Sequence, residues 1–255
     1  MLITSGNDFF GIRETTGMRI LQRLINFTGV FCFVSIICMA CCGIEYPAAW
    51  GHDAKSEVDH WESEIRKFEE LDQKLPPPVG ANVFVGSSSV RLWKLDASFP
   101  KSVCINRGFG GSQMGDSARY VDRIVINYKP RVVVLYAGDN DIAGGKTPTM
   151  VRDDYRVFRS KIQKTLPEAR IVLISLKPSP SRWKLREQAQ EANRLLREEV
   201  IAGTNQVFVD VWTPMLGDDG MPRAELFVKD NLHMNDAGYK VWNQLIATHL
   251  HPAKE

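Results

Sequence analysis

The sequence predicts an α/β fold, a three-layer α/β/α sandwich in which helices cover both faces of a sheet of about five parallel strands. Five short, almost continuously apolar segments rich in valine and isoleucine recur from residue 82 onward. Such segments are typical of strands that are buried on both faces of a parallel sheet. Longer segments with helical patterning separate them, and parallel strands need such crossover connections.

The expected elements follow one another along the chain. Strands are expected at residues 82–86, 102–108, 131–138, 169–176 and 206–211. Helices are expected at about residues 114–128, 149–166, 182–202 and 235–249. Sheets of this kind bind ligands beyond the carboxyl ends of their strands. The residues directly after each strand are therefore the candidates for a functional site.

An amphipathic helix is expected before the first strand, within residues 53–75. Apolar side chains recur there with helical spacing at Trp61, Ile65, Phe68 and Leu71. Charged residues occupy the other positions, which is the pattern of a helix with one buried face. Three consecutive prolines then end the helix. We expect a helix and linker at residues 50–79 and a main domain at residues 80–251.

Residues 1–49 predict an export signal. Residues 24–43 carry no charge, follow three arginines and precede small residues. This is the pattern of a secretory signal peptide, although a segment of about 20 apolar residues can also span a membrane as an anchor. We expect an exported protein, periplasmic or extracellular, or an anchored one with its domain outside the cytoplasm. Membrane contact is expected only through this segment, if it is not cleaved.

The charge of the chain narrows the class of partner. The formal net charge is +2, with 32 basic and 30 acidic residues. No excess of basic residues points to nucleic acid, which is not an expected partner. A small-molecule, carbohydrate or lipid substrate remains open.

Glycine-rich and polar segments follow four of the five expected strands. They begin at residues 86, 106, 137 and 229. Each has a structural explanation, because serine caps helices, glycine makes turns, and Asp and Asn favour loops. Together, however, they contain the groups that acyl transfer needs.

A serine nucleophile needs a base within hydrogen-bond reach, and the base needs an orienting carboxylate. Of the five histidines, only His233 lies on a loop expected at the strand ends, and Asp230 precedes it by three residues. The tetrahedral intermediate also needs donors directed at its oxyanion. A backbone N–H at Gly111 and the side-chain amide of Asn140 are suitable, because both follow strands.

The four segments, in this order, resemble those of the GDSL or SGNH hydrolases, esterases and lipases named for a Ser, a Gly, an Asn and a His. "FVGSSSV" looks like the F-x-G-D-S block, which makes Ser88 the nucleophile. "NRGFGGS" is similar to the N-x-G-x-G-G block of the acetylhydrolase-like branch, and places the oxyanion glycine at Gly111. "GDND" resembles G-x-N-D, with Asn140 as donor, and "DNLH" resembles D-x-x-H, with Asp230 and His233.

The resemblance covers about residues 80–250 and implies an SGNH hydrolase domain over residues 80–251. It implies a flavodoxin-like fold, no metal or organic cofactor, and hydrolysis of carboxylic esters through an acyl-enzyme. The N–H of Ser88 is implied as a further oxyanion donor beside Gly111 and Asn140. One position departs from the pattern, because Ser87 stands where the family has Asp.

The substrate stays open at this stage. Acetyl or short acyl groups on carbohydrate or lipid are expected, and the absence of a long apolar lid segment favours acetylated polysaccharide over lipid. Trp93, Trp183 and Trp212 could stack on a sugar ring, line an acyl pocket or simply pack in the core. The alternatives are an acyltransferase that moves the acyl group to a sugar hydroxyl, or a non-catalytic carbohydrate-binding module on the same fold.

Overall fold

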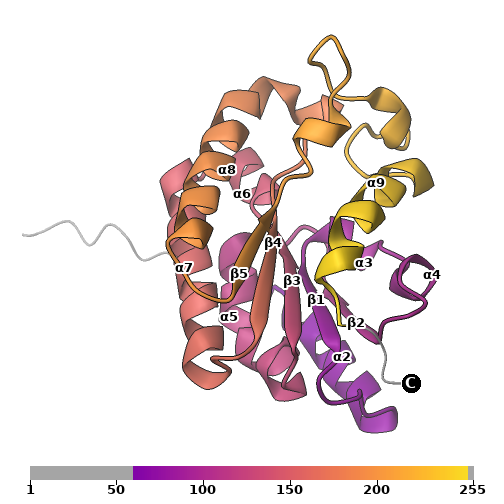
Figure 1. Cartoon of the computed structure of the whole chain (residues 1–255), viewed down its shortest axis with the longest axis vertical. Helices are drawn as coiled ribbons and strands as arrows, with labels where there is room; N and C mark the ends of the chain where they lie inside the picture. Colours follow the sequence, from indigo (N-terminus) through magenta and orange to yellow (C-terminus); the bar gives the residue numbers. More distant parts are fainter. Residues whose placement is uncertain (1–59, 252–255) are drawn as a thin grey trace, which may run out of the picture. The chain divides into compact units, whose positions relative to one another are not determined.

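The computed structural model describes residues 60–251 and contains a single parallel sheet (Figure 1). Its strands are β1 (Asn82–Gly86), β2 (Cys104–Gly108), β3 (Val132–Tyr136), β4 (Arg170–Ile174) and β5 (Gln206–Val209). Their order across the sheet is β2-β1-β3-β4-β5. The predicted α/β fold with five parallel strands is confirmed. The predicted export segment, residues 1–49, lies outside the described residues.

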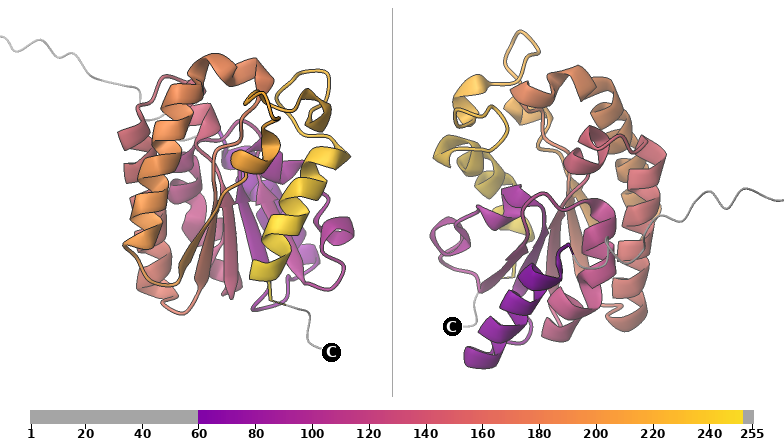
Figure 2. Two further views of the ribbon diagram at one scale, coloured as in Figure 1. Left: turned by 45° about the horizontal axis from the view of Figure 1, so that its top comes forward. Right: turned by 180° about the vertical axis from the view of Figure 1, so that it is seen from behind.

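Helices cover both faces of the sheet (Figure 2). The longer ones are α2 (Glu62–Lys74), α5 (Met114–Ile124), α7 (Pro148–Thr165), α8 (Arg186–Ile201) and α9 (Asp236–Ile246). Three short helices were not predicted, and they are α3 (Ser88–Arg91), α4 (Leu95–Ser98) and α6 (Asp139–Ala143). Within residues 60–251, no helix is long and apolar enough to cross a membrane.

The alternation of side chains along the strands builds two separate cores. In β1, Val83 and Val85 belong to the core under α2, α5, α7 and α8. Phe84 points to the other face and belongs to the core under α3, α4 and α9, together with Trp93 and Trp242. Both sets of side chains are buried, as the continuous apolar pattern of the strands predicts.

The register aligns the carboxyl ends of three neighbouring strands. Gly86 at the end of β1 pairs with Gly108 at the end of β2 and with Tyr136 at the end of β3. The loops that follow these strands therefore emerge at one edge of the sheet. This edge is where the polar segments of the sequence come together.

Helix α2 is fixed to α5 by one buried apolar residue and by ion pairs. Ile65 is completely buried. The guanidinium of Arg123 on α5 pairs with Glu62 at 2.8 Å and with Glu69 at 2.6 Å. Near the other end of α2, the Tyr128 hydroxyl donates to the Asp72 carboxylate at 2.5 Å. These contacts hold the start of α2 above the carboxyl end of the sheet.

Candidate active site

Ser88 lies at the first residue of α3, directly beyond the end of β1. The turn before it requires Gly86, whose φ is +134° and whose added Cβ would lie 1.9 Å from the Tyr136 carbonyl oxygen. Only glycine fits such a close approach in this conformation. The turn brings the Ser88 hydroxyl to 2.9 Å from Nε2 of His233.

His233 and Asp230 lie on the loop before α9. A bridge between Phe227 and Met234 closes this loop. The ring Nδ1 of His233 lies 2.6 Å from Oδ2 of Asp230, while Oδ1 accepts the backbone N–H groups of Leu232 and His233 at 2.8 and 2.9 Å. A carboxylate only accepts hydrogen bonds, so Nδ1 carries the proton and Nε2 accepts from the serine hydroxyl.

The electrostatics of Asp230 agree with this arrangement. The hydrogen bond from the His233 ring, helped by the backbone N–H groups, lowers the pKa of Asp230 to about 2. The carboxyl is therefore ionised at neutral pH. An ionised carboxylate orients the imidazole and stabilises the imidazolium that forms when the ring takes a proton.

Three hydrogen-bond donors surround Ser88. Among the described residues, the backbone N–H groups of Ser88 and Gly111 have no acceptor. The Asn140 amide donates one hydrogen to the Ser112 carbonyl at 2.9 Å, which leaves its second hydrogen free. Ser88, Gly111, Asn140 and His233 all line one open cavity of about 490 Å³. Such an arrangement can bind an oxyanion next to an activated serine.

Residues 85–241, more than half of the chain, match the sequence model of the GDSL-like Lipase/Acylhydrolase family. The chain belongs to this family. A GDSL-like acylhydrolase is an enzyme that hydrolyses esters, so the predicted enzyme class is confirmed. A comparison with curated proteins finds no match.

Solved structures share the fold of this GDSL-like acylhydrolase at low sequence identity. A GDSL-like lipase from Bacteroides thetaiotaomicron is 21% identical with a TM-score of 0.63, and the match covers 73% of this chain and 97% of that one. A lipase/acylhydrolase from Enterococcus faecalis is 21% identical with a TM-score of 0.57, covering 69% and 100%. An acetylxylan esterase from Geobacillus stearothermophilus is 15% identical with a TM-score of 0.55, covering 69% and 96%.

The structure places the predicted site residues of this acylhydrolase together. Ser88, His233 and Asp230 form one hydrogen-bonded chain, and Gly111 and Asn140 flank Ser88. Their roles in turnover remain predictions. The geometry shows only that each group lies where its predicted role needs it.

The three consecutive serines have different surroundings. Of the three, only Ser88 has its hydroxyl within hydrogen-bond distance of a histidine ring. Ser87 and Ser89 are both 1% exposed, and their hydroxyls have no hydrogen-bond partner among the described residues. Ser87 thus fills the place of the family Asp as a small buried side chain, without a carboxylate and without a replacement hydrogen bond.

A buried ionic network fixes the Asn140 side chain, and sequence reasoning missed it. The guanidinium of Arg182 donates to Oδ1 of Asn140 at 2.8 Å and lies 3.1 Å from the Asp139 carboxylate. Asp139 also pairs with the buried Lys177 at 2.9 Å. Burial alone would raise the pKa of Asp139, but the charges of Lys177 and Arg182 hold it below its ordinary value. The amide of Asn140 is oriented by the bond from Arg182, because the oxygen rather than the nitrogen must accept it.

Asp141 supports the same loop from the opposite side. Its side chain is completely buried, accepts the Met114 backbone N–H at 2.9 Å and pairs with Lys146 at 3.1 Å. Burial raises the pKa of this carboxyl despite the nearby Lys146. Asp141 therefore joins the start of α5 to α6, and it does not line the cavity at Ser88.

The aromatic residue at the cavity is none of the three tryptophans considered from the sequence. Trp93 and Trp212 are buried, and Trp183 stacks on Trp212 with ring centroids 5.9 Å apart. Instead, Trp61 at the start of α2 lines the cavity. Its ring packs edge-on against Phe109 at 5.4 Å. Helical spacing identified Trp61 as part of a buried face, but not which element it would meet.

Proposed function

We propose that this GDSL-like acylhydrolase is an exported serine esterase that removes acetyl or short acyl groups from carbohydrate through an acyl-enzyme on Ser88. One observation carries the proposal. The Ser88 hydroxyl lies 2.9 Å from His233, which is held by Asp230, beside three donors that can bind an oxyanion. Export is inferred from the uncharged residues 24–43 and the basic residues before them.

The first half of the reaction forms the acyl-enzyme. As the Ser88 oxygen bonds to the ester carbon, Nε2 of His233 takes the hydroxyl proton and the carbonyl oxygen becomes an oxyanion. The N–H groups of Ser88 and Gly111 and the Asn140 amide bind that oxyanion. The bond to the alcohol oxygen then breaks, and His233 gives its proton to the leaving oxygen.

The second half releases the acid. Water attacks the acyl carbon while His233 takes its proton, and the same donors bind the second oxyanion. The bond to the Ser88 oxygen then breaks, and the serine recovers its proton from His233. All proton transfers pass through Nε2, and Asp230 stays ionised throughout.

A polar ester is favoured as substrate over a long-chain lipid. The cavity at Ser88 presents Trp61 together with the charged side chains of Glu64, Arg91 and Arg182. An aromatic ring among polar groups suits a sugar, whereas an alkyl chain would desolvate these charges without compensation. The fold shared with an acetylxylan esterase points in the same direction.

The test is a comparison of ester substrates. Turnover of p-nitrophenyl acetate, butyrate and octanoate and of acetylated xylan is measured with purified protein. We expect acetate and acetylated xylan to be hydrolysed and octanoate to be a poor substrate. Turnover of none of these esters would contradict the proposed activity, and a preference for octanoate would contradict the proposed substrate class.

A further inference from the structure

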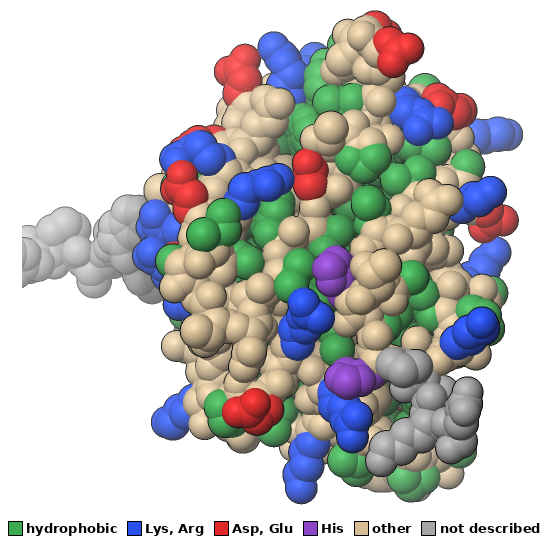
Figure 3. Space-filling view, in the orientation of Figure 1, with side chains coloured by type: hydrophobic (Ala, Val, Ile, Leu, Met, Phe, Trp, Pro, Cys, Tyr) green, Lys and Arg blue, Asp and Glu red, His purple; other side chains and the backbone are tan. Residues whose placement is uncertain are grey.

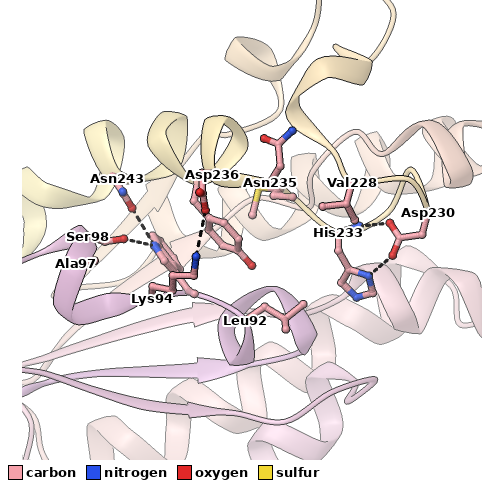
Figure 4. A pocket seen from close by; sticks show the side chains of 13 residues that line it. Leu92, Lys94, Ala97, Ser98, Val228, Asp230, His233, Asn235, Asp236 and Asn243 are labelled. Carbon is pink, nitrogen blue, oxygen red and sulfur yellow. Dashed lines mark hydrogen bonds and ion pairs between the residues drawn. The ribbon is translucent and has the colours of Figure 1, made fainter.

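A second cavity lies beside His233, and the proposed chemistry at Ser88 does not use it. Its volume is about 750 Å³, within the range of ligand pockets. It runs between residues 92–98 and residues 228–243. Figure 4 shows His233 and Asp230 at one end and Ala97 at the other, with α9 along one side. We call it the α9 groove.

The α9 groove meets the cavity at Ser88 only at His233. That residue lines both spaces, whereas Gly111 and Asn140 line only the cavity at Ser88. The oxyanion must face Gly111 and Asn140, and the leaving oxygen must come within hydrogen-bond reach of Nε2 of His233. The alcohol portion of a bound ester is therefore directed toward the histidine side, where the α9 groove begins.

We propose that the α9 groove binds the alcohol portion of the ester and that this portion is a glycan chain of more than one sugar residue. The inference rests on the proposed esterase function and adds the part of the substrate that the enzyme recognises. The acyl group stays in the cavity at Ser88.

The walls of the α9 groove combine apolar surfaces with polar side chains that solvent or a ligand can reach. Leu92 and Val228, near His233, are large apolar side chains that are 40% and 43% exposed. Farther along, Lys94 and Asp236 form a solvent-exposed ion pair at 3.5 Å. The Asn243 amide oxygen accepts the indole N–H of Trp93 at 2.8 Å, and its nitrogen has no partner within residues 60–251.

This combination selects a sugar over an alkyl chain. A pyranose ring has apolar C–H faces that can lie on Leu92 and Val228, and hydroxyls that can bond to Lys94, Asp236 and Asn243. An alkyl chain would cover the same polar groups and return no hydrogen bonds, which costs free energy for each group left unsatisfied. The groove volume of about 750 Å³ also exceeds that of one sugar ring, which is why we infer more than one sugar residue.

The test uses a substitution that narrows the α9 groove at the end far from Ser88 and His233. Ala97 is exposed on α4 and lines the far end of the groove (Figure 4). Ala97→Trp places an indole there, and Ser160→Trp on the exposed surface of α7 is the matched control. For each variant, kcat/KM is measured with p-nitrophenyl acetate, p-nitrophenyl octanoate and acetylated xylo-oligosaccharides.

We expect Ala97→Trp to lower kcat/KM for the oligosaccharides by about tenfold to a hundredfold, mainly through KM, as for a changed pocket contact. Activity on p-nitrophenyl acetate should stay within about twofold of wild type, which also shows that the variant folds. Ser160→Trp should change kcat/KM for neither the oligosaccharides nor p-nitrophenyl acetate. Lys94→Ala is a second variant for the case that the new tryptophan disturbs α4, because the Lys94 side chain is highly exposed. It should raise KM for the oligosaccharides and leave KM for p-nitrophenyl acetate unchanged.

Three results would overturn the inference. Equal effects of Ala97→Trp and Ser160→Trp on the oligosaccharides, in an enzyme active on p-nitrophenyl acetate, would show that the groove binds no glycan. A loss confined to octanoate would assign the groove to the acyl chain, and thus to a lipid. A wild-type protein without activity on any ester would refute the esterase function itself, and this inference with it.

Discussion

Asn140→Ala tests the predicted oxyanion site most directly. The expected loss of turnover follows from the number of hydrogen bonds that the Asn140 amide can donate. One amide hydrogen of Asn140 is used by the Ser112 carbonyl, so one remains for the substrate. Removal of one oxyanion donor typically lowers turnover by about 10²–10³-fold, or about 2.7–4 kcal/mol of transition-state stabilisation. We expect this loss in kcat, with a smaller change in KM.

The effect on folding should be smaller than the effect on turnover. The Asn140 side chain makes two hydrogen bonds to protein groups, with Ser112 and Arg182. Their loss should reduce the free energy of unfolding by about 1–2 kcal/mol. Arg182 keeps its ion pair with Asp139, so no buried charge is left unpaired.

The assay measures kcat and KM for p-nitrophenyl acetate together with thermal unfolding. Asn127→Ala is a suitable control, because Asn127 is exposed and lines neither cavity. Asp141→Ala is unsuitable, since it would leave the buried backbone N–H of Met114 without its acceptor. Equal turnover in Asn140→Ala and Asn127→Ala would refute the assignment of Asn140 as a donor.

Further predictions concern the nucleophile, its carboxylate and the N-terminus. Ser88→Ala should lose about 10⁴–10⁶ in turnover, and a serine-reactive phosphonate should label Ser88, whereas label on either neighbouring serine would assign the nucleophile elsewhere. Because the pKa of Asp230 is lowered from 3.8 to about 2, its contribution to stability is present above the ordinary pKa and is lost as the pH falls toward 2. As the pH falls from 3.8 toward 2, the melting temperature should therefore decrease more steeply in wild type than in Asp230→Asn. The difference should be small, because the carboxylate is about half exposed. If the protein is exported as we propose, its mature form should begin near Trp50. N-terminal sequencing that finds residues 24–43 intact in the membrane fraction would instead favour a membrane anchor.

The strands could be predicted because burial on both faces leaves a simple pattern. The run from Val132 to Tyr136 is apolar throughout, and all its side chains are buried. The short helices α3 and α6 could not be predicted, since each has only four or five residues. Their conformation depends on the tight turns at Gly86 and Gly138, both with positive φ, and no helical period can be detected over so few residues.

The candidate site could be predicted because its parts follow successive parallel strands. The register that pairs Gly86 with Gly108 and Tyr136 brings the loops after these strands together. The sequence could not identify the bond from Arg182 to Asn140, because it joins residues 42 positions apart. An arginine in the short 3-10 helix after β4 (Pro180–Leu185) has no local pattern that distinguishes it from a surface residue.

The start of α2 shows why a family match does not mark the limits of a functional site. The match begins at residue 85, yet Trp61 lines the cavity at Ser88, and its ring lies 3.4 Å from where a side chain on Gly111 would begin. Arg123 holds α2 in this position through Glu62 and Glu69. Because these contacts join α2 to α5 through side chains alone, two sequences with the same sheet and the same four blocks can close this side of the cavity with different helices. The wall built by α2 is therefore where substrate preference can differ while the residues around Ser88 stay the same.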